Sequence, residues 1–273
     1  MPEQFDSWDS YFWDPGGPVL RNLYGVRDGA ALAKLEYAET TAQQSFIQAG
    51  LTPIARTYDA EHLRAIHKQL FGKVYEWAGE YRTVAIQKNL SEFAHPGDVP
   101  RYLNDVGRIV RGAQWSTMNR DQFAATAAEV FSYLNQAHPF REGNGRTGKL
   151  FMQQVSELSP YRIDYNPAAS GVTPEIWNQA SMLSGPDRGR YEPQPASLVP
   201  VFRAMAVERP PAPQAAAPGA STELRRDRSP YRASFPRPAT EATKPGTSAG
   251  PTNRPPQTPG DAPTSGETDR ENP

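Results

Sequence analysis

Residues 138–149 have the sequence His-Pro-Phe-Arg-Glu-Gly-Asn-Gly-Arg-Thr-Gly-Lys. Pro139 and the run Gly143-Asn144-Gly145 favour a loop, whereas apolar residues on both sides recur at helical spacing. The apolar residues are Phe131 and Leu134 before the loop and Leu150, Phe151 and Val155 after it. The stretch is therefore expected to join two helices.

The composition of this loop is typical of a phosphate-binding site. Glycines at the start of a helix let the backbone approach a ligand, and the first amides of the helix have no intrahelical partners. These amides and the positive end of the helix dipole favour an anion. Arg146, in the first turn, opposes that dipole and is better explained by facing a phosphate, and Lys149 follows at i+3 on roughly the same face. One anion site and two cations suit a chain of phosphates.

Two further residues of the loop indicate chemistry at the phosphates. Glu142 would repel a phosphate unless a divalent cation lies between them, and Mg²⁺ commonly binds one or two carboxylates together with phosphate oxygens and water. His138 has an ordinary pKa of about 6.5, so much of it is neutral near pH 7 and can accept the proton of an attacking hydroxyl. The alternative is a simple helix-helix connection in which this histidine is structural.

Residues 138–149 resemble the signature H-x-F-x-[DE]-G-N-G-R-x-x-R of the Fic family at every specified position but the last. The resemblance implies a mainly α, Fic-type helical bundle that transfers AMP from ATP to a Ser, Thr or Tyr hydroxyl of a target protein and releases pyrophosphate. It implies Mg²⁺ as the cofactor and Phe140 as an anchor in the core. By the resemblance, His138 would be the general base and Glu142 the magnesium ligand. Gly143, Asn144 and Gly145 would form the anion hole, and Arg146 would bind the β-phosphate.

Lys149 departs from the signature, because the family more often has a second arginine that binds the γ-phosphate. A lysine keeps the charge but loses the bidentate fork. In the family, an inhibitory glutamate on an [ST]-x-x-x-E-[GN] helix pairs with that arginine. The nearest string here, Thr57 to His62, ends in histidine and is better explained by a helix cap at Asp59. We therefore predict that a small helical antitoxin supplies the inhibitory glutamate and that the chain is the toxin of a toxin-antitoxin pair.

Other activities fit the same residues. One is a kinase like the Doc branch, although Doc-like chains carry lysine in place of the glycine at position 145. UMP or phosphocholine donors, or another phosphodiester transfer, are further alternatives. A third class is a non-catalytic nucleotide-binding or interaction module. By resemblance, target proteins could include bacterial type II topoisomerases, although no residue of the chain specifies them.

A β-hairpin is predicted before the signature. Thr83, Val84, Ala85, Ile86, Gln87 and Lys88 alternate in type, the turn-forming Asn89 follows, and the hairpin would end near Phe93. The segment from His62 to Thr83 resembles the bacterial toxin branch of the Fic family, and the similarity extends over roughly residues 10–205. In the family this hairpin is a flap that pairs with the target by strand addition. Lys88 and Asn89 would lie at the rim of the nucleotide site.

Helix caps and breakers predict most of the remaining fold. Asp28 would cap a helix to about Gln48 with Leu32, Leu35, Ala38 and Ala42 facing inward, and Asp59 would cap a helix that closes at Gly72. Further helices are expected from Asn119 to the signature, from the signature to Pro160, from Thr173 to Gly185, and around Leu198 to Met205. His62 and His67 are five residues apart, which suits packing or capping better than a zinc pair.

The composition of the chain divides it into three parts. We expect residues 1–27 to form an aromatic arm and residues 207–273 a disordered Pro-rich tail, and the resemblance implies that residues 28–206 form the Fic domain. The tail holds 14 of the 28 prolines and no Trp, Ile or Met, so it cannot bury enough apolar surface to fold. It also carries an arginine-rich patch at Arg225, Arg226, Arg228, Arg232 and Arg237, expected to be solvated.

Cysteine content, apolar runs and net charge indicate the cellular compartment and the kinds of partner. The chain has no cysteine, which fits a reducing compartment, and no secretory signal or apolar run that would cross a membrane. Its net charge of −1 argues against a large nucleic-acid interface. We predict a cytoplasmic protein, with a secreted effector left open.

Overall fold

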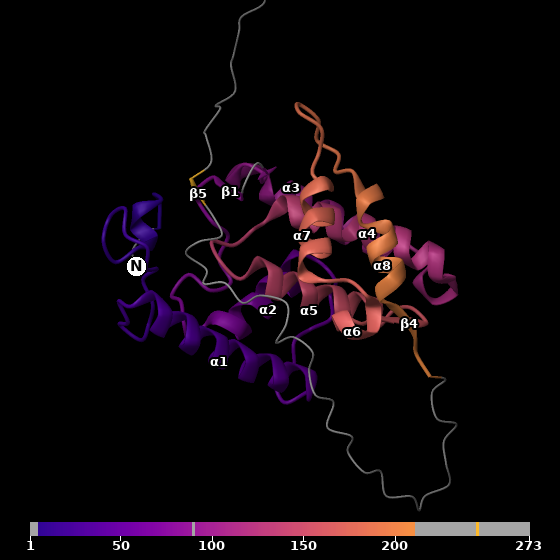
Figure 1. Cartoon of the computed structure of the whole chain (residues 1–273), viewed down its shortest axis with the longest axis horizontal. Helices are drawn as coiled ribbons and strands as arrows, with labels where there is room; N and C mark the ends of the chain where they lie inside the picture. The colour runs from indigo at the N-terminus through magenta and orange to yellow at the C-terminus, as the bar shows by residue number, and fades with distance from the viewer. Residues whose placement is uncertain (1–4, 89–90, 211–243, 246–273) are drawn as a thin grey trace, which may run out of the picture.

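Helix α4 (Arg120–Ala137) is the central helix of the fold. In the computed structural model, which describes residues 5–88, 91–210 and 244–245, α4 packs against α3 (Val99–Gly112), α5 (Asn144–Ser156) and α8 (Val199–Met205). One face of α4 is apolar and fully buried, and this face includes Phe123, Ala127 and Val130. The predicted mainly helical class is confirmed (Figure 1).

The other long helices surround α5 and α4. Helix α1 (Gly29–Gln48) packs on α2 (Ala60–Phe71), and α2 packs on α5. Helix α7 (Pro174–Leu183) packs on α8. The short elements are η1 (Asp9–Tyr11), η2 (Pro96–Asp98), η3 (Trp115–Thr117), α6 (Pro167–Ser170) and η4 (Pro195–Ser197). No helix among the described residues has the length and apolar character that crossing a bilayer requires.

Side-chain caps begin the helices where the sequence predicts them. Asn119 and Gln122 form a reciprocal capping box at the start of α4, so two backbone amides are satisfied by side chains. Asp28 accepts from the amide of Ala31, Asp59 from those of Glu61 and His62, and Thr173 from that of Ile176. Each cap acts within three residues, so it can be identified from sequence alone.

The inward face predicted for α1 is wrong for most of its residues. Its buried residues are Leu32, Glu36, Thr40, Gln43 and Ile47, whereas Leu35 is 42% exposed. Three of the five buried side chains are polar, so apolar periodicity pointed to the wrong stripe of the helix. This polar face contacts the signature loop, as described below.

The predicted hairpin is present but begins later. Strands β1 (Ile86–Lys88) and β2 (Ser91–Glu92) pair antiparallel, and β5 (Lys244–Pro245) pairs with the other edge of β1. Strand β1 begins after Thr83, Val84 and Ala85. The Arg82 guanidinium donates to the Val84 carbonyl at 2.8 Å, and the Thr83 hydroxyl donates to the Phe5 carbonyl, so these groups are bonded outside the sheet. Asn89, which the sequence assigned to the nucleotide rim, lies outside the described residues.

The folded domain continues past the predicted boundary at residue 206. Strand β4 (Ala206–Glu208) pairs with β3 (Tyr161–Ile163), and the Arg209 amide then donates to the Pro160 carbonyl at 2.7 Å. Composition does not indicate this strand, because β4 is held by backbone hydrogen bonds, which do not depend on residue type. The rest of the predicted tail, with its arginine patch, lies outside the described residues except for β5.

The aromatic arm packs on the body of the domain. Tyr11 and Phe12 are buried in the core, and the indole of Trp13 donates to the Val26 carbonyl at 3.0 Å. Arg141 of the signature loop is itself 2% exposed, and its guanidinium lies 4.2 Å from the centre of the Trp8 ring. Cation-π contact with the arm therefore helps to hold the loop.

Candidate active site

His138 ends α4 in a left-handed conformation. Its φ is 38° and its ψ 58°, while its amide still donates to the Leu134 carbonyl at 3.2 Å. The partly buried ring stacks on Phe93, just after β2, with 3.7 Å between ring centres. Burial, followed by the charges of Arg82 and Lys88, holds the pKa of His138 well below its ordinary value. The imidazole is therefore neutral near pH 7 and can accept a proton.

The loop after His138 is closed by one side chain. Asn144 accepts from the Phe140 amide at 2.8 Å and donates to the Phe140 carbonyl at 2.7 Å. The Phe140 ring is fully buried, as predicted for an anchor, and stacks on His67 with 3.8 Å between ring centres. The Asn144 side chain thus shapes the loop, and what it offers to an anion is its backbone amide.

The start of α5 has the geometry of an anion site. Gly143 has φ of +82°, and an added Cβ would lie 2.4 Å from the Phe71 ring, so only glycine fits there. The first hydrogen bond within the helix runs from the Thr147 amide to the Gly143 carbonyl at 3.0 Å. The amides of Asn144, Gly145 and Arg146 therefore precede that bond at the positive end of the helix, where Gly145 is exposed.

Arg146 is held by α1. Its guanidinium donates to Glu36 at 2.5 Å and to Thr40 at 3.2 Å, and it stacks over Phe71 at 4.6 Å. The second oxygen of Glu36 accepts from the Tyr75 hydroxyl. The sequence interpretation did not include Glu36. Its i,i+4 spacing from Leu32 and Thr40 was the available signal, but a buried carboxylate is recognised only once its cationic partner is known.

Glu142 lies beside the same guanidinium, 3.4 Å from Arg146. Burial and then the charge of Glu36 raise the pKa of Glu142, while Arg146 opposes the rise. A bound divalent cation would relieve this repulsion between carboxylates. No cluster of three or more acidic, His or Cys ligands occurs in the part of the chain that the structure describes. One carboxylate at the mouth of an anion site fits Mg²⁺, which takes its other ligands from phosphate and water.

His62 and His67 have packing roles, as the sequence favoured. Nδ1 of His67 accepts from the Gly79 amide at 2.8 Å, so Nε2 carries the proton and donates to the Glu142 carbonyl at 2.9 Å. Burial lowers the pKa of His67 to about 3. His62 instead bonds Gln154 at 2.6 Å. His67 therefore holds the signature loop through the Glu142 carbonyl and the Phe140 ring. Sequence spacing alone did not indicate this role.

Comparison with known proteins agrees with this geometry. Residues 57–156 match the Fic/DOC family. A Sinorhizobium fredii protein named probable protein adenylyltransferase y4lH is 31% identical over 154 residues, which are 55% of this chain and 77% of that protein. The chain belongs to the Fic/DOC family.

Two further relatives define how much of a Fic protein the chain spans. Protein adenylyltransferase VbhT of Bartonella schoenbuchensis is 35% identical over 164 residues, which are 60% of this chain but 34% of VbhT. The chain thus covers about a third of that relative. The N-terminal Fic domain of a VirB-translocated effector from Bartonella quintana, solved with bound ADP, has a TM-score of 0.61 and 28% identity, covering 73% of this chain and 95% of that one.

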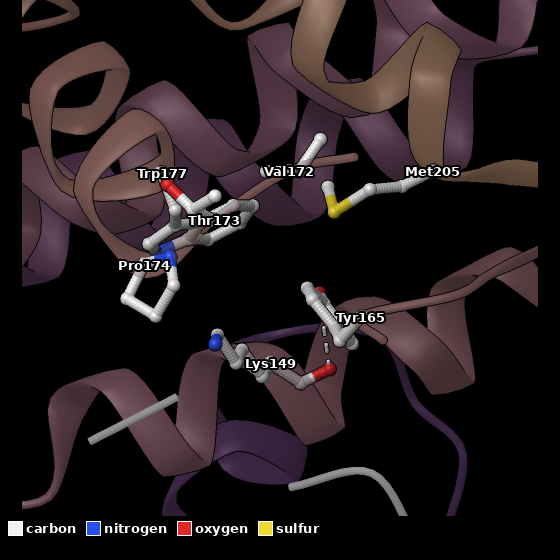
Figure 2. Close-up of a pocket in the computed structure, with 7 residues that line it drawn as sticks. All are labelled: Lys149, Tyr165, Val172, Thr173, Pro174, Trp177 and Met205. Atoms are coloured by element: carbon white, nitrogen blue, oxygen red, sulfur yellow. Dashed lines mark hydrogen bonds between the residues drawn. The ribbon is translucent and has the colours of Figure 1, made fainter. Parts of the chain in front are cut away.

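In this Fic domain the last signature residue points away from Arg146. Lys149 is 4% exposed, and its ammonium lies 5.0 Å from the Tyr165 ring centre and 5.2 Å from that of Trp177 (Figure 2). The small pocket around it is also lined by Val172, Thr173, Pro174 and Met205. Burial lowers the pKa of Lys149 to about 7. The expectation that both cations share one face is wrong, because Arg146 turns to α1 and Lys149 to α7.

The β1–β2 hairpin of this Fic domain is tied to the end of α4. The Ala94 amide donates to the Gln136 carbonyl at 2.9 Å, and the Gln136 side chain donates to the Glu92 carbonyl at 3.2 Å. These bonds hold β2 beside His138. Lys88, at the end of β1, is near enough to lower the pKa of that histidine. Its predicted role at the nucleotide rim stays a prediction.

Proposed function

We propose that the chain is a protein adenylyltransferase, a nucleotidyltransferase that moves AMP from ATP to a hydroxyl side chain of a target protein. The observation that carries the proposal is a neutral His138 five residues before Gly143, the N-cap of α5, where the amides of Asn144, Gly145 and Arg146 precede the first hydrogen bond of the helix. The names of the curated relatives and the ADP bound in the Bartonella quintana domain support the same donor class.

The chain's own residues supply the proton acceptor and part of the charge stabilisation for this reaction. The imidazole of His138 accepts the proton of the target hydroxyl as its oxygen attacks the α-phosphorus. The new O–P bond forms while the bond from the α-phosphorus to the bridging oxygen breaks, and pyrophosphate leaves. Amides of Asn144, Gly145 and Arg146 stabilise the phosphate oxygens. Mg²⁺ held at Glu142 would supply charge neutralisation on the phosphates.

The target is proposed to bind along the flap. Strand β1 has β2 on one edge, and on the other edge it already pairs with β5, with Ile86 opposite Pro245 and Gln87 opposite Lys244. A target segment would add to that second edge in place of β5. Because Phe93 at the end of the hairpin stacks on His138, a target strand on β1 would bring its hydroxyl toward the imidazole.

The test is transfer of label from ATP to protein. Purified protein with α-³²P-ATP, Mg²⁺ and cell lysate should label a target band. His138→Ala should abolish the label, since general-base catalysis contributes about 10²- to 10⁴-fold. His95→Ala is the matched control, because His95 is exposed and caps only η2. Label from γ-³²P-ATP but not from α-³²P-ATP would replace the proposal with a kinase, and binding without transfer would leave an interaction module.

We further propose that the chain is the toxin of a pair whose small helical antitoxin supplies an inhibitory glutamate. Support comes from Glu61, the glutamate in the string of this chain that is nearest to the inhibitory motif. Glu61 lies in the first turn of α2, is exposed, and pairs with Arg64 at 3.2 Å rather than with a signature cation. Expression of the chain alone should slow growth, and co-expression of the antitoxin should restore it. Normal growth at confirmed expression would contradict this role.

The cellular setting follows from the donor, and the first target to test follows from the family resemblance. Because ATP is the donor, we place the reaction in a cytoplasm, either of the producing cell or, for a secreted effector, of a recipient cell. Type II topoisomerases are the first targets to test. Intact-mass measurement of purified gyrase after the reaction should show the mass of one AMP group, and an unchanged mass would remove this target.

A further inference from the structure

One buried arginine joins the flap to the end of α4. The Arg82 side chain is 2% exposed, and within the described residues its hydrogen bonds all go to backbone carbonyls. Nε donates to the His138 carbonyl at 2.7 Å, Nη1 to that of Val84 at 2.8 Å, and Nη2 to those of Ala94 and, at 3.3 Å, Ala137. Its own amide donates to the Pro139 carbonyl at 2.8 Å. The residue is thus bonded on both sides of His138.

The charge of Arg82 is balanced by dipoles. Across residues 5–88 and 91–210, no ion pair within 4.0 Å joins Arg82 to a carboxylate. Ala137 is the last residue of α4 and His138 its C-cap, where carbonyls lack intrahelical donors and the helix dipole is negative. A guanidinium presents five donors in a fixed fork, so one side chain can satisfy several such carbonyls. The carbonyls around Arg82 therefore explain how its charge is buried without a neighbouring carboxylate.

The four carbonyls belong to two parts of the site, the β1–β2 hairpin and the end of α4. Val84 precedes β1 and Ala94 follows β2, so Arg82 holds both ends of the flap. Ala137 and His138 carry the imidazole, which sits in a left-handed conformation that a non-glycine residue rarely adopts. The other links between flap and α4 are made by Gln136 and by Phe93 stacking on His138. Arg82 is the charged member of this connection.

We propose that Arg82 is a positioning residue for the transfer reaction, which sets the flap that binds the target at a fixed distance from the imidazole of His138. This inference rests on the proposed function. It separates two tasks within the site, because Arg82 contacts neither the anion-binding amides of α5 nor Glu142. Nucleotide binding should then be independent of Arg82, whereas use of a bound target should depend on it.

Two substitutions separate geometry from charge. Arg82→Lys keeps a cation but loses the fork, and Arg82→Met loses both. Misplacement of about 1 Å lowers turnover by up to about 100-fold, so both variants should lose roughly 10- to 100-fold in kcat with ATP affinity changed less than about twofold. Arg64→Gln is the matched control: Arg64 also donates to a carbonyl, that of Gly79 at 2.9 Å, but belongs to α2 and does not contact His138.

A second readout follows His138 directly. Burial lowers the pKa of His138 most, followed by the charges of Arg82 and of Lys88 on β1, while a hydrogen bond with the backbone of Asn135 raises it. In NMR titrations, the His138 pKa should rise in Arg82→Met and stay nearly unchanged in Arg82→Lys and Arg64→Gln. Hydrogen exchange of the Ile86–Lys88 amides should be faster in both Arg82 variants than in the control.

The outcomes distinguish the positioning role from the function on which it rests. If wild-type protein transfers no label, the proposed function fails, while exchange of the flap amides and titration of His138 still test Arg82. If folded Arg82→Lys keeps its kcat and its flap protection within about twofold of wild type, the positioning role is overturned. If Arg82→Met does not fold, Arg82→Lys alone decides. A parallel loss of ATP affinity and kcat would indicate general damage and also overturn it.

Discussion

Gly143 is the residue whose backbone most restricts substitution in the signature loop. Gly143→Ala would place a Cβ 2.4 Å from the buried Phe71 ring at a positive φ, so we expect a loss of about 1–3 kcal/mol in the free energy of unfolding. Gly148, five residues later in α5, has its nearest neighbour at 3.6 Å. Gly148→Ala should be neutral or stabilising by up to about 1 kcal/mol. Urea unfolding of both variants measures this contrast, and equal effects would contradict it.

Lys149 should make stability depend on pH. Its pKa is about 7 in the folded chain against an ordinary 10.5, so between these values the unfolded state binds a proton that the folded state lacks. The contribution of Lys149 to stability should therefore rise with pH from 7 to 10.5 and be constant below 7. Each unit of pKa shift is worth about 1.4 kcal/mol, so the rise should be a few kcal/mol.

The comparison that isolates this effect is Lys149→Met, which keeps the volume and removes the charge. The variant should be most stabilised relative to wild type below pH 7, and the difference should shrink toward pH 10.5. Chemical denaturation at several pH values gives the two curves. Parallel curves would mean that the ammonium is already well solvated in the folded protein.

At the scale of elements, the polar face of α1 holds the first signature cation. Glu36→Gln should lower the free energy of unfolding by about 3 kcal/mol, at the low end for a broken buried ion pair, because Arg146 keeps Glu142 as a partner. Glu39, on the same helix, pairs with the exposed Lys73 at 3.3 Å, so Glu39→Gln should cost less than about 1 kcal/mol. Thermal unfolding compares the two, and similar losses would refute the special role of Glu36.

Helix α1 has one feature that the sequence predicts, its N-terminal cap, and one that it does not, its buried face. Helix α1 begins at its predicted cap, Asp28, because that contact spans three residues. Its buried face was misassigned because the partner of Glu36 is Arg146, 110 residues away. Propensity and capping are local, whereas the burial of a carboxylate depends on a cation that only the packed helix bundle brings near.

At the scale of the whole molecule, the end of the folded domain can be tested by truncation. A chain ending at Pro210 should keep its Tm and its transfer activity, since β4 and Arg209 remain. A chain ending at Met205 loses β4, whose Ala206 is buried, and the bonds of Arg209 to Pro160 and Tyr161. We expect its Tm to fall by at least about 5 °C, because several hydrogen bonds of about 1 kcal/mol each are lost. An unchanged Tm would place the boundary at residue 206 after all.

The sequence by itself determined most of the helices, although not α3, together with their caps and the loop that defines the family. Asn119, Asp59 and Thr173 act on amides two or three residues away, and the glycines of the signature restrict only their own backbone. Tertiary structure alone decided that Arg146 turns to Glu36, that Lys149 lies between Tyr165 and Trp177, and that Arg82 binds both ends of the flap. These contacts join elements distant in the chain, and their geometry is set by packing, which local periodicity does not record.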